Sequence, residues 1–246
     1  MASDRAPLSF GIKTSQAGLG YDEILRVWRE ADRVPEFQDA WLWDHRVPLR
    51  GDVTGAALEA WTLLAALAAQ TSRLRLGVIV TSNRIRPPAV LAKMAATVDV
   101  IAAGRLVFGI GAGGSATSDP GYAQLVHREY DPFGIDVVPA DEALAALAET
   151  CTLVKRLWTE EKPFDFDGRG HRLSGIRSVQ VFFTAQEPSA GTARHPGPAA
   201  ARELLAELFD AGARHCVLSC IGLPSAQWVA DEIIRPVRAM TGHDGC

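Results

Sequence analysis

The sequence predicts an α/β fold in which helices cover a parallel sheet. Up to Gly109, short segments rich in aliphatic and β-branched residues alternate with longer segments whose apolar residues recur at helical spacing. Strands that alternate with helices need crossover connections, and these produce a parallel sheet with helices packed outside it. Hydrophobic residues make up 48% of the chain and charged residues 22%, which is enough for a large core and a charged surface.

The first four strands and the three helices between them follow from this alternation. The strands are expected at 8–14, 39–44, 73–82 and 105–109. The helices are expected at 21–37, 54–70 and 87–103. Thr54 is the expected N-cap of the second helix, and Pro87 or Pro88 suits the first turn of the third.

The segment from Gly111 to Pro139 interrupts the alternation because it is long and polar and contains both Gly and Pro. Loops of this length are usually functional, so the segment is expected to lie over the site as a lid or binding loop. Within it, His127, Arg128, Glu129 and Tyr130 either contact a substrate or are simply exposed to solvent.

The remaining segments are expected as a helix, a hairpin, two strands and two more helices. The amphipathic helix spans 141–158, and the hairpin at 163–174 turns at Asp167-Gly168. The later elements are a strand at 178–184, a linker at 185–197, a helix at 198–209, a strand at 215–221 and a helix from its cap Ser225 to about Met240.

The predicted strands and helices are too few for a complete barrel. Four units use about 160 residues, and a (β/α)8 barrel would need four more from about 85. Residues 1–246 are therefore expected to form one domain, an incomplete barrel or an open sheet, because no linker or repeat divides them. With about six strands, those at 178–184 and 215–221 must face a gap or pair with each other out of the usual order.

Charge and motif content exclude several classes of protein. The net charge is −4 without a basic run, so nucleic acid is not an expected partner. No apolar stretch suits a membrane span, and the polar start of the chain does not resemble a signal peptide, so the cytoplasm is expected. The four cysteines form no Cys-x-x-Cys pair, and the zinc-peptidase, nucleophile-elbow and Walker motifs do not occur, so no metal site is expected.

Trp43-Asp44-His45 is the sharpest candidate site, because it places titratable groups at the carboxyl end of an apolar strand. In parallel α/β folds that end carries the active site. A histidine there can hold or pass a proton near neutral pH, and a neighbouring carboxylate can fix its orientation. The alternative is a turn in which Asp44 caps the next segment and His45 is polar surface.

Glycines from Gly109 to Gly114 formally satisfy Gly-x-Gly-x-x-Gly after a strand. A dinucleotide site would require an apolar helix to begin at once, whereas 115–122 is polar and contains Pro120. The glycines are therefore expected either to let the backbone approach a flat cofactor ring or to make a tight turn.

Several runs resemble the luciferase-like monooxygenase family, especially its deazaflavin-dependent actinobacterial branch. They are the WDH element and the segments 58–80, 88–113, 129–134 and 204–238, which together cover most of the chain. The resemblance implies a parallel barrel that binds coenzyme F420, which the branch favours, or FMN at the carboxyl ends of its strands.

The resemblance also implies roles for particular residues. His45 would lie beside the cofactor ring and assist proton transfer, with Asp44 supporting it and contributing to the cofactor site. A cis peptide bond between Ile79 and Val80 would back the ring. Gly111, Ala112 and Gly113 would lie along the cofactor.

The chain departs from the family at two places. Gly114 stands where some members have a catalytic Glu, and the Ile-Gly-Gly strand and two further units expected after Gln180 are missing. These units would supply much of the phosphate-binding wall, so weak cofactor binding, or none that is tight, is expected.

The implied activity is a flavin- or deazaflavin-dependent oxidoreductase or monooxygenase that acts on a small organic substrate, in specialised metabolism. The alternative is a non-catalytic flavin-binding or partner subunit. A homodimer is expected, with the Ala-rich helices at 54–70 and 87–103 at a two-fold interface.

Overall fold

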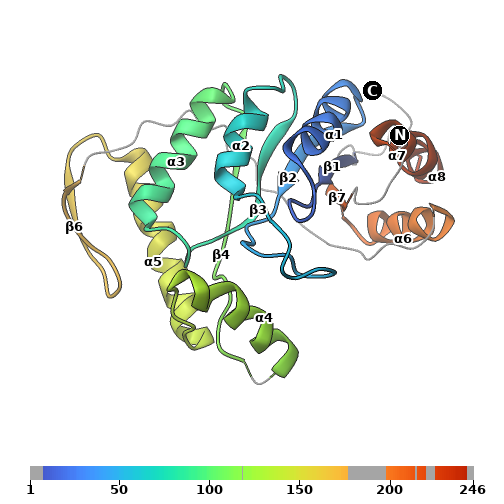
Figure 1. Ribbon diagram of the computed structural model, residues 1–246. Coiled ribbons are helices and arrows are strands. Elements are labelled where there is room, and N and C mark those ends of the chain that lie inside the picture. The colour runs from blue at the N-terminus through green and yellow to red at the C-terminus, as the bar shows by residue number, and fades with distance from the viewer. Residues whose placement is uncertain (1–7, 118, 177–197, 214, 220–224, 243–246) are drawn as a thin grey trace.

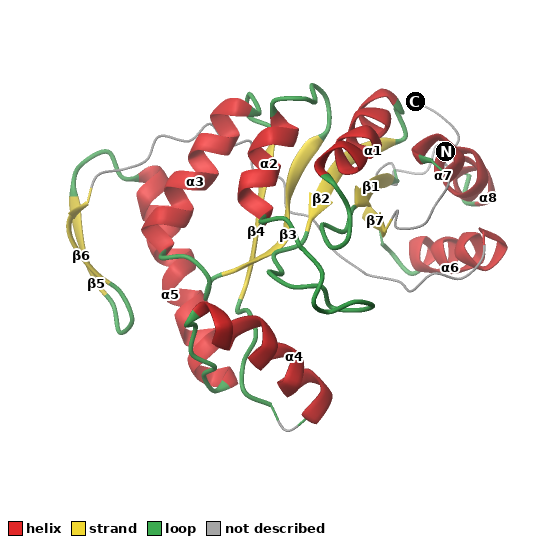
Figure 2. Ribbon diagram, viewed as in Figure 1, coloured by secondary structure: helices red, strands yellow, loops and turns green. Residues whose placement is uncertain are grey.

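The computed structural model describes residues 8–117, 119–176, 198–213, 215–219 and 225–242. Five parallel strands form one sheet in the order β4-β3-β2-β1-β7, with helices packed outside it (Figures 1 and 2). The strands are β1 (Ser9–Lys13), β2 (Phe37–Leu42), β3 (Arg75–Ser82), β4 (Leu106–Gly111) and β7 (His215–Ser219). The predicted α/β class and parallel sheet are confirmed, and the described strands form a (β/α) arrangement of the TIM-barrel type that does not close.

Side chains of the sheet alternate between the helix-covered face and the inner face. Phe10 and Ile12 of β1 are fully buried in the main core, whereas Gly11 faces the other way, toward the Asp39 side chain. A Cβ at Gly11 would overlap the Asp39 carboxylate, so only glycine leaves room for it. Residues in register on neighbouring strands share a face, and Asp39 and Trp41 of β2 therefore lie on the inner face with Gly11.

Three helices cover the strands of the amino-terminal half: α1 (Tyr21–Arg33), α2 (Ala60–Ala68) and α3 (Pro88–Ile101). Helix α1 is amphipathic and buries Ile24, Trp28 and Ala31. It ends four residues before the predicted limit, because Phe37 already belongs to β2.

The predicted cap of α2 is wrong. The helix begins at Ala60, and the Glu59 side chain accepts hydrogen bonds from the amides of Trp61 and Thr62. Thr54 instead lies in a turn, where its amide and hydroxyl donate to Asp52. The longer glutamate side chain reaches two of the free amides of the first turn here, and its charge suits that end of the helix.

The segment predicted as one long loop contains a helix, and this is the main correction to the fold. Helix α4 (Pro120–Tyr130) continues into the 3-10 turn η1 (Asp131–Phe133). The Asp119 side chain caps α4 by accepting from the Tyr122 amide, and Pro120 occupies its first turn. Helix α4 lies at the lower end of the sheet in Figure 1, next to the carboxyl ends of β3 and β4.

Helix α5 (Ala140–Thr159) and the antiparallel hairpin of β5 (Phe164–Asp167) and β6 (Arg172–Ile176) confirm the next two predictions. A second, smaller core joins them to α3. Its buried members are Ala92, Ala96, Leu153, Val154, Leu157 and Phe164.

The last described strand, near the end of the chain, pairs with the first strand. Helix α6 (Pro198–Asp210) precedes β7, and Ser225 caps the final helical run of α7 (Ala226–Val229), η2 (Ala230–Ile234) and α8 (Arg235–Met240). Strand β7 pairs in parallel with β1 along its full length and is the edge strand of the described sheet, so the expectation that it faces a gap or pairs with 178–184 on its other edge stays a prediction. The expected strand at 178–184 and linker at 185–197 lie outside the described residues.

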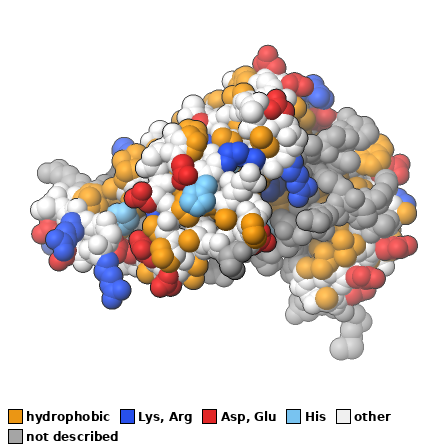
Figure 3. Space-filling view, turned by 60° about the horizontal axis from the view of Figure 1, so that its bottom comes forward, with side chains coloured by type: hydrophobic (Ala, Val, Ile, Leu, Met, Phe, Trp, Pro, Cys, Tyr) orange, Lys and Arg blue, Asp and Glu red, His pale blue; other side chains and the backbone are white. Residues whose placement is uncertain are grey.

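None of the helices in the described part of the chain combines the length and the apolar character that crossing a membrane requires. On the face drawn in Figure 3, acidic and basic side chains are interspersed with apolar ones over the described residues.

Candidate active site

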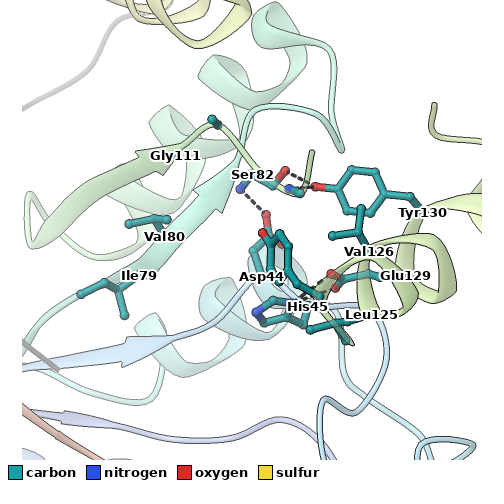
Figure 4. A pocket seen from close by; sticks show the side chains of 14 residues that line it. Asp44, His45, Ile79, Val80, Ser82, Gly111, Leu125, Val126, Glu129 and Tyr130 are labelled. Carbon is teal, nitrogen blue, oxygen red and sulfur yellow. Dashed lines mark hydrogen bonds and ion pairs between the residues drawn. The ribbon is translucent and has the colours of Figure 1, made fainter. Parts of the chain in front are cut away.

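The carboxyl ends of β2, β3 and β4 meet helix α4 around a cavity of about 410 Å³ (Figure 4). The cavity combines an apolar wall with a few polar groups, as small-molecule sites usually do, and its volume lies in their range. The lining residues are Asp44, His45, Ile79, Val80, Ser82, Gly111, Ala112, Gly113, Gly114, Tyr122, Leu125, Val126, Glu129 and Tyr130. Every residue predicted for the cofactor site thus lines the same cavity.

His45 follows the end of β2 and is held by a carboxylate from α4. Its Nδ1 lies 2.9 Å from Oε1 and 3.0 Å from Oε2 of Glu129. The Arg46 amide also donates to Glu129 Oε1, at 2.9 Å. The Glu129 side chain is buried, whereas 35% of the His45 side chain is exposed, so the pair leaves the imidazole open on one side.

These contacts set the charge of Glu129. Burial by itself raises the pKa of its carboxyl, but the hydrogen bond and charge of His45, the Arg46 amide and the Arg46 charge outweigh burial. The pKa of Glu129 therefore lies below its ordinary value, and the carboxylate is ionised near neutral pH.

The hydrogen bonds of the Asp44 carboxylate go to Arg86 and Ser82 and not to His45, so any support that Asp44 gives His45 is through the strand end and not through a direct hydrogen bond. Its carboxylate receives two hydrogen bonds from Arg86, at 2.8 and 2.9 Å, and one from the Ser82 amide, at 3.0 Å. Arg86 also pairs with Glu59. Burial lowers the pKa of the Arg86 guanidinium, but the hydrogen bonds and charges of Asp44 and Glu59 more than compensate and raise it. This network ties the end of β2 to β3 and to the start of α2.

The peptide bond between Ile79 and Val80 is cis, which confirms the expected backbone feature of β3. Both side chains line the cavity, and Val80 is 50% exposed although it lies within a strand. Val80 therefore presents an apolar surface to whatever fills the cavity.

The glycines at the end of β4 and just after it make room for neighbouring parts of the protein. A Cβ at Gly111 would lie 2.8 Å from the Val80 side chain, and one at Gly114 would crowd Val126 and Tyr130. Gly113 has a φ of 78°, which favours glycine, and a Cβ there would overlap Ser82. The helix that follows begins only at Pro120, so the dinucleotide interpretation fails as expected.

Tyr130 closes the cavity on the side of α4. Its hydroxyl accepts a hydrogen bond from the Gly114 amide at 2.6 Å and lies 3.1 Å from Ser82 Oγ. Its ring also stacks under the Arg46 guanidinium, 5.0 Å from the ring centroid. Helix α4 is thereby fixed to both the β3 and β4 ends.

The sequence left Glu129 and Tyr130 open between substrate contact and solvent exposure, and the structure places both in the cavity lining. Arg86, which holds Asp44, was not predicted. A signal for the first two was present, because Asp119-Pro120 is a typical N-cap and first-turn pair. A helix begun there would bring Glu129 and Tyr130 together with Val126 on one face. No comparable local signal marks Arg86.

A second polar cluster lies at the amino ends of the strands, on the inner face. Asp39 is fully buried, and its carboxylate accepts from Trp41 Nε1 at 2.6 Å and from Arg75 at 3.0 Å. His215 Nε2 lies 3.2 Å from Asp39 Oδ2, close enough for an ion pair although the angle does not make a hydrogen bond. Ser9 Oγ is hydrogen-bonded to His215 Nδ1. None of these residues lines the cavity.

Known proteins share this fold. An F420-dependent secondary alcohol dehydrogenase in complex with an F420-acetone adduct superposes with a TM-score of 0.63 at 19% identity, over 97% of this chain and 66% of that structure. A monooxygenase from Streptomyces bottropensis has a TM-score of 0.57 at 24% identity, over 96% of this chain and 66% of that structure.

Proteins related in sequence include F420-dependent dehydrogenases and a ketoreductase. An F420-dependent glucose-6-phosphate dehydrogenase of Kineococcus radiotolerans is 31% identical over 168 residues, which are 68% of this chain and 45% of the relative. A phthiodiolone/phenolphthiodiolone dimycocerosates ketoreductase of a Mycobacterium species is 36% identical over 106 residues, 42% of this chain and 24% of the relative. The chain spans about half the length of the curated relatives it matches.

The model of one protein family, described as luciferase-like monooxygenase, matches residues 7–215. That match covers most of the chain, including all the residues that line the cavity. The chain therefore belongs to the luciferase-like monooxygenase family.

Proposed function

We propose that the chain is an oxidoreductase that uses F420 or FMN to oxidise or reduce a small organic molecule in the cavity. The observation that carries this proposal is the position of His45, which projects from a strand end into a largely apolar cavity. Catalytic groups of (β/α) folds come from the carboxyl ends of strands. The family supports redox chemistry of this kind.

The residues present fit the ring of such a cofactor. Ile79 and the exposed Val80 form an apolar wall, and the glycines at 111–113 bring the backbone to the cavity edge without side chains. In this proposal these residues and Asp44 hold the ring. When bound, the cofactor supplies the hydride chemistry that protein side chains lack.

The protein's own residues supply proton transfer and exclusion of water. His45 would hold or release a proton at Nε2, the ring nitrogen that Glu129 does not contact. Asp44 and Arg86 fix the strand end from which His45 projects. The side chains of Leu125, Val126 and Tyr130 cover the cavity from α4.

We favour F420 over FMN. The relatives from Kineococcus, Nakamurella and Microbacterium are F420-dependent dehydrogenases by name. FMN is the cofactor named with a type II Baeyer-Villiger monooxygenase of the same fold.

A non-catalytic cofactor-binding or partner subunit is the second candidate. Among the described residues that line the cavity, neither lysine nor arginine occurs to bind a phosphate. This observation favours weak binding of any phosphorylated cofactor, as the sequence led us to expect.

Titration of the purified protein with F420 and with FMN, followed by absorption and fluorescence, tests the proposal. We expect binding of F420, weaker than nanomolar, and oxidation or reduction of F420 by one member of a panel of small alcohols and ketones. Binding without turnover of any panel member would favour the second candidate, and failure to bind either cofactor would overturn the proposal.

We also propose a homodimer. Helix α3 exposes Val90, Val100 and Ile101 to solvent in the single chain, and two-fold contact is the commonest way to bury such residues. Light scattering at micromolar concentration should give twice the monomer mass of 26.4 kDa. A monomer would contradict this proposal.

A further inference from the structure

We propose that Glu129 is the positioning residue of His45: its carboxylate holds Nδ1 of the imidazole protonated and directs Nε2 into the cavity. The inference deepens the proposed function and rests on it for the catalytic meaning of His45. It assigns to a residue 84 positions away the support that the sequence suggested for the adjacent Asp44.

The contact between the two side chains is specific. Both carboxylate oxygens of Glu129 lie within 3.0 Å of His45 Nδ1. An ionised carboxylate can only accept hydrogen bonds, so the nitrogen that faces it must carry the proton. The neutral imidazole is then left with a free electron pair on Nε2.

The carboxylate is itself held in place. One oxygen accepts from the Arg46 amide at 2.9 Å, and the Arg46 Nε donates to the Glu129 carbonyl at 3.3 Å. The next residue, Tyr130, anchors the same turn of α4 to Ser82 and to the Gly114 amide. Rotation of the Glu129 side chain away from His45 would also break its hydrogen bond with the Arg46 amide, while the contacts of the Glu129 carbonyl and of Tyr130 hold the backbone of this turn in place.

The free side of the imidazole faces the cavity. Figure 4 shows the second ring nitrogen of His45 on the side opposite Glu129, in the half of the view where Ile79 and Val80 lie. The exposed part of the His45 side chain and its place in the cavity lining agree with this orientation. A proton can therefore be exchanged with a bound molecule at Nε2 while Nδ1 remains on Glu129.

Asp44 cannot share this role in the observed arrangement. One of its oxygens accepts from both Arg86 and the Ser82 amide, and the other accepts from Arg86. Among the described residues, Glu129 is the carboxylate that contacts His45. Its position in a helix that reaches the strand ends makes the pairing dependent on α4.

Nitrogen-15 NMR of the imidazole groups, in protein without added cofactor, tests the tautomer directly. At about pH 9, where an ordinary imidazole is neutral, we expect His45 Nδ1 to be protonated and Nε2 unprotonated. The His45 signals are assigned by their loss in His45→Ala. Glu129→Ala should move the proton to Nε2 in part of the population. A wild-type protein with the proton on Nε2, or a Glu129→Ala variant with unchanged signals, would overturn the proposal.

Kinetics separate positioning from a purely structural role. With the cofactor and substrate found by titration, Glu129→Ala should lower kcat about 100-fold. The same variant should change KM and the cofactor Kd less than about 3-fold, because the cavity walls remain. Glu129→Gln keeps the size and an acceptor oxygen, so it should fold normally and retain more of kcat. Glu142→Gln, an exposed carboxylate on α5, is the matched control.

The two measurements distinguish failure of this inference from failure of the proposed function. If the chain turns over no substrate, the tautomer of His45 still decides whether Glu129 positions it. If turnover occurs and Glu129→Ala leaves kcat unchanged, the positioning role is wrong although the proposed function stands.

Discussion

The two ends of strand β2 carry similar polar groups in different settings. Asp39 near the amino end pairs with Arg75 and lies beside His215, and Asp44 past the carboxyl end pairs with Arg86 and precedes His45. At the amino end the histidine points at the buried aspartate and at Ser9. At the carboxyl end the histidine is held on one side only, and its other side opens to the cavity. An aspartate, an arginine and a histidine therefore mark a candidate site only where a cavity leaves one of them accessible.

The largest expected effect is a loss of stability on substitution of Asp39, near the amino end of β2. Asp39→Ala removes the buried anion between Arg75 and His215 and should lower the free energy of unfolding by about 3 kcal/mol. Urea unfolding followed by circular dichroism measures this loss. A change below about 1 kcal/mol would show that the cluster does not hold the sheet together.

The next largest expected effect is a loss of catalysis on substitution of His45, past the carboxyl end of β2. His45→Ala should lower kcat about 100-fold, because it removes a proton-transfer group, with little change in the urea midpoint. His215→Ala is the matched variant and should do the reverse, lowering the midpoint while kcat stays within about 3-fold. Equal losses of kcat in both variants would erase the distinction between the two ends.

A smaller loss of stability is expected where the cavity meets α4. Gly113→Ala forces a left-handed φ and an overlap with Ser82, so it should destabilise the protein by about 2 kcal/mol. Gly51 has a similar φ of 72° but open space around it, so Gly51→Ala should cost only about 1 kcal/mol. Thermal unfolding of the two variants side by side gives the difference. Equal costs would mean that the contact with Ser82 is relaxed without penalty.

The smallest effect is a pH dependence. The pKa of Glu129 is lower in the folded chain than its ordinary value of 4.5, so the unfolded chain binds more protons there. The stability that the ionised Glu129 carboxylate contributes to the folded chain is fully present above the ordinary pKa. It is lost as pH falls through the pKa of the folded chain. The difference in stability between wild type and Glu129→Gln should therefore shrink as pH falls below about 5. A difference that grows toward low pH would have the wrong sign.

Local patterns predicted most of the sheet and its covering helices. The apolar runs predicted β1 to β4, the first-turn proline Pro88 begins α3, and Ser225 caps α7 as predicted. The pattern failed in α4, whose polar composition and early proline resemble a loop when neighbours in space are unknown. It failed also at Thr54, because Glu59 competes for the same helix start.

The candidate site was predicted only in part, since its decisive contacts join distant segments. His45 and the cavity edge at 111–113 follow from strand ends and family motifs. The pairs His45–Glu129 and Asp44–Arg86 join residues 84 and 42 positions apart. Arginine is common on surfaces, so nothing in the local pattern distinguishes Arg86 from a solvated side chain. The helix start at Asp119-Pro120 places Glu129 on a helix face but does not identify His45 as its partner.

The pairing of β1 with β7 has a consequence for synthesis on the ribosome. Phe10 and Cys216 are register partners. The edge of β1 that binds β7 therefore stays unpaired until some 200 further residues are translated, which takes about 10 to 40 s at ordinary elongation rates. During that interval its backbone donors and acceptors can pair with other nascent chains. Expression at lower temperature or with chaperones should therefore raise the yield of properly folded protein, and a circular permutant that places β7 directly before β1 should depend on them less.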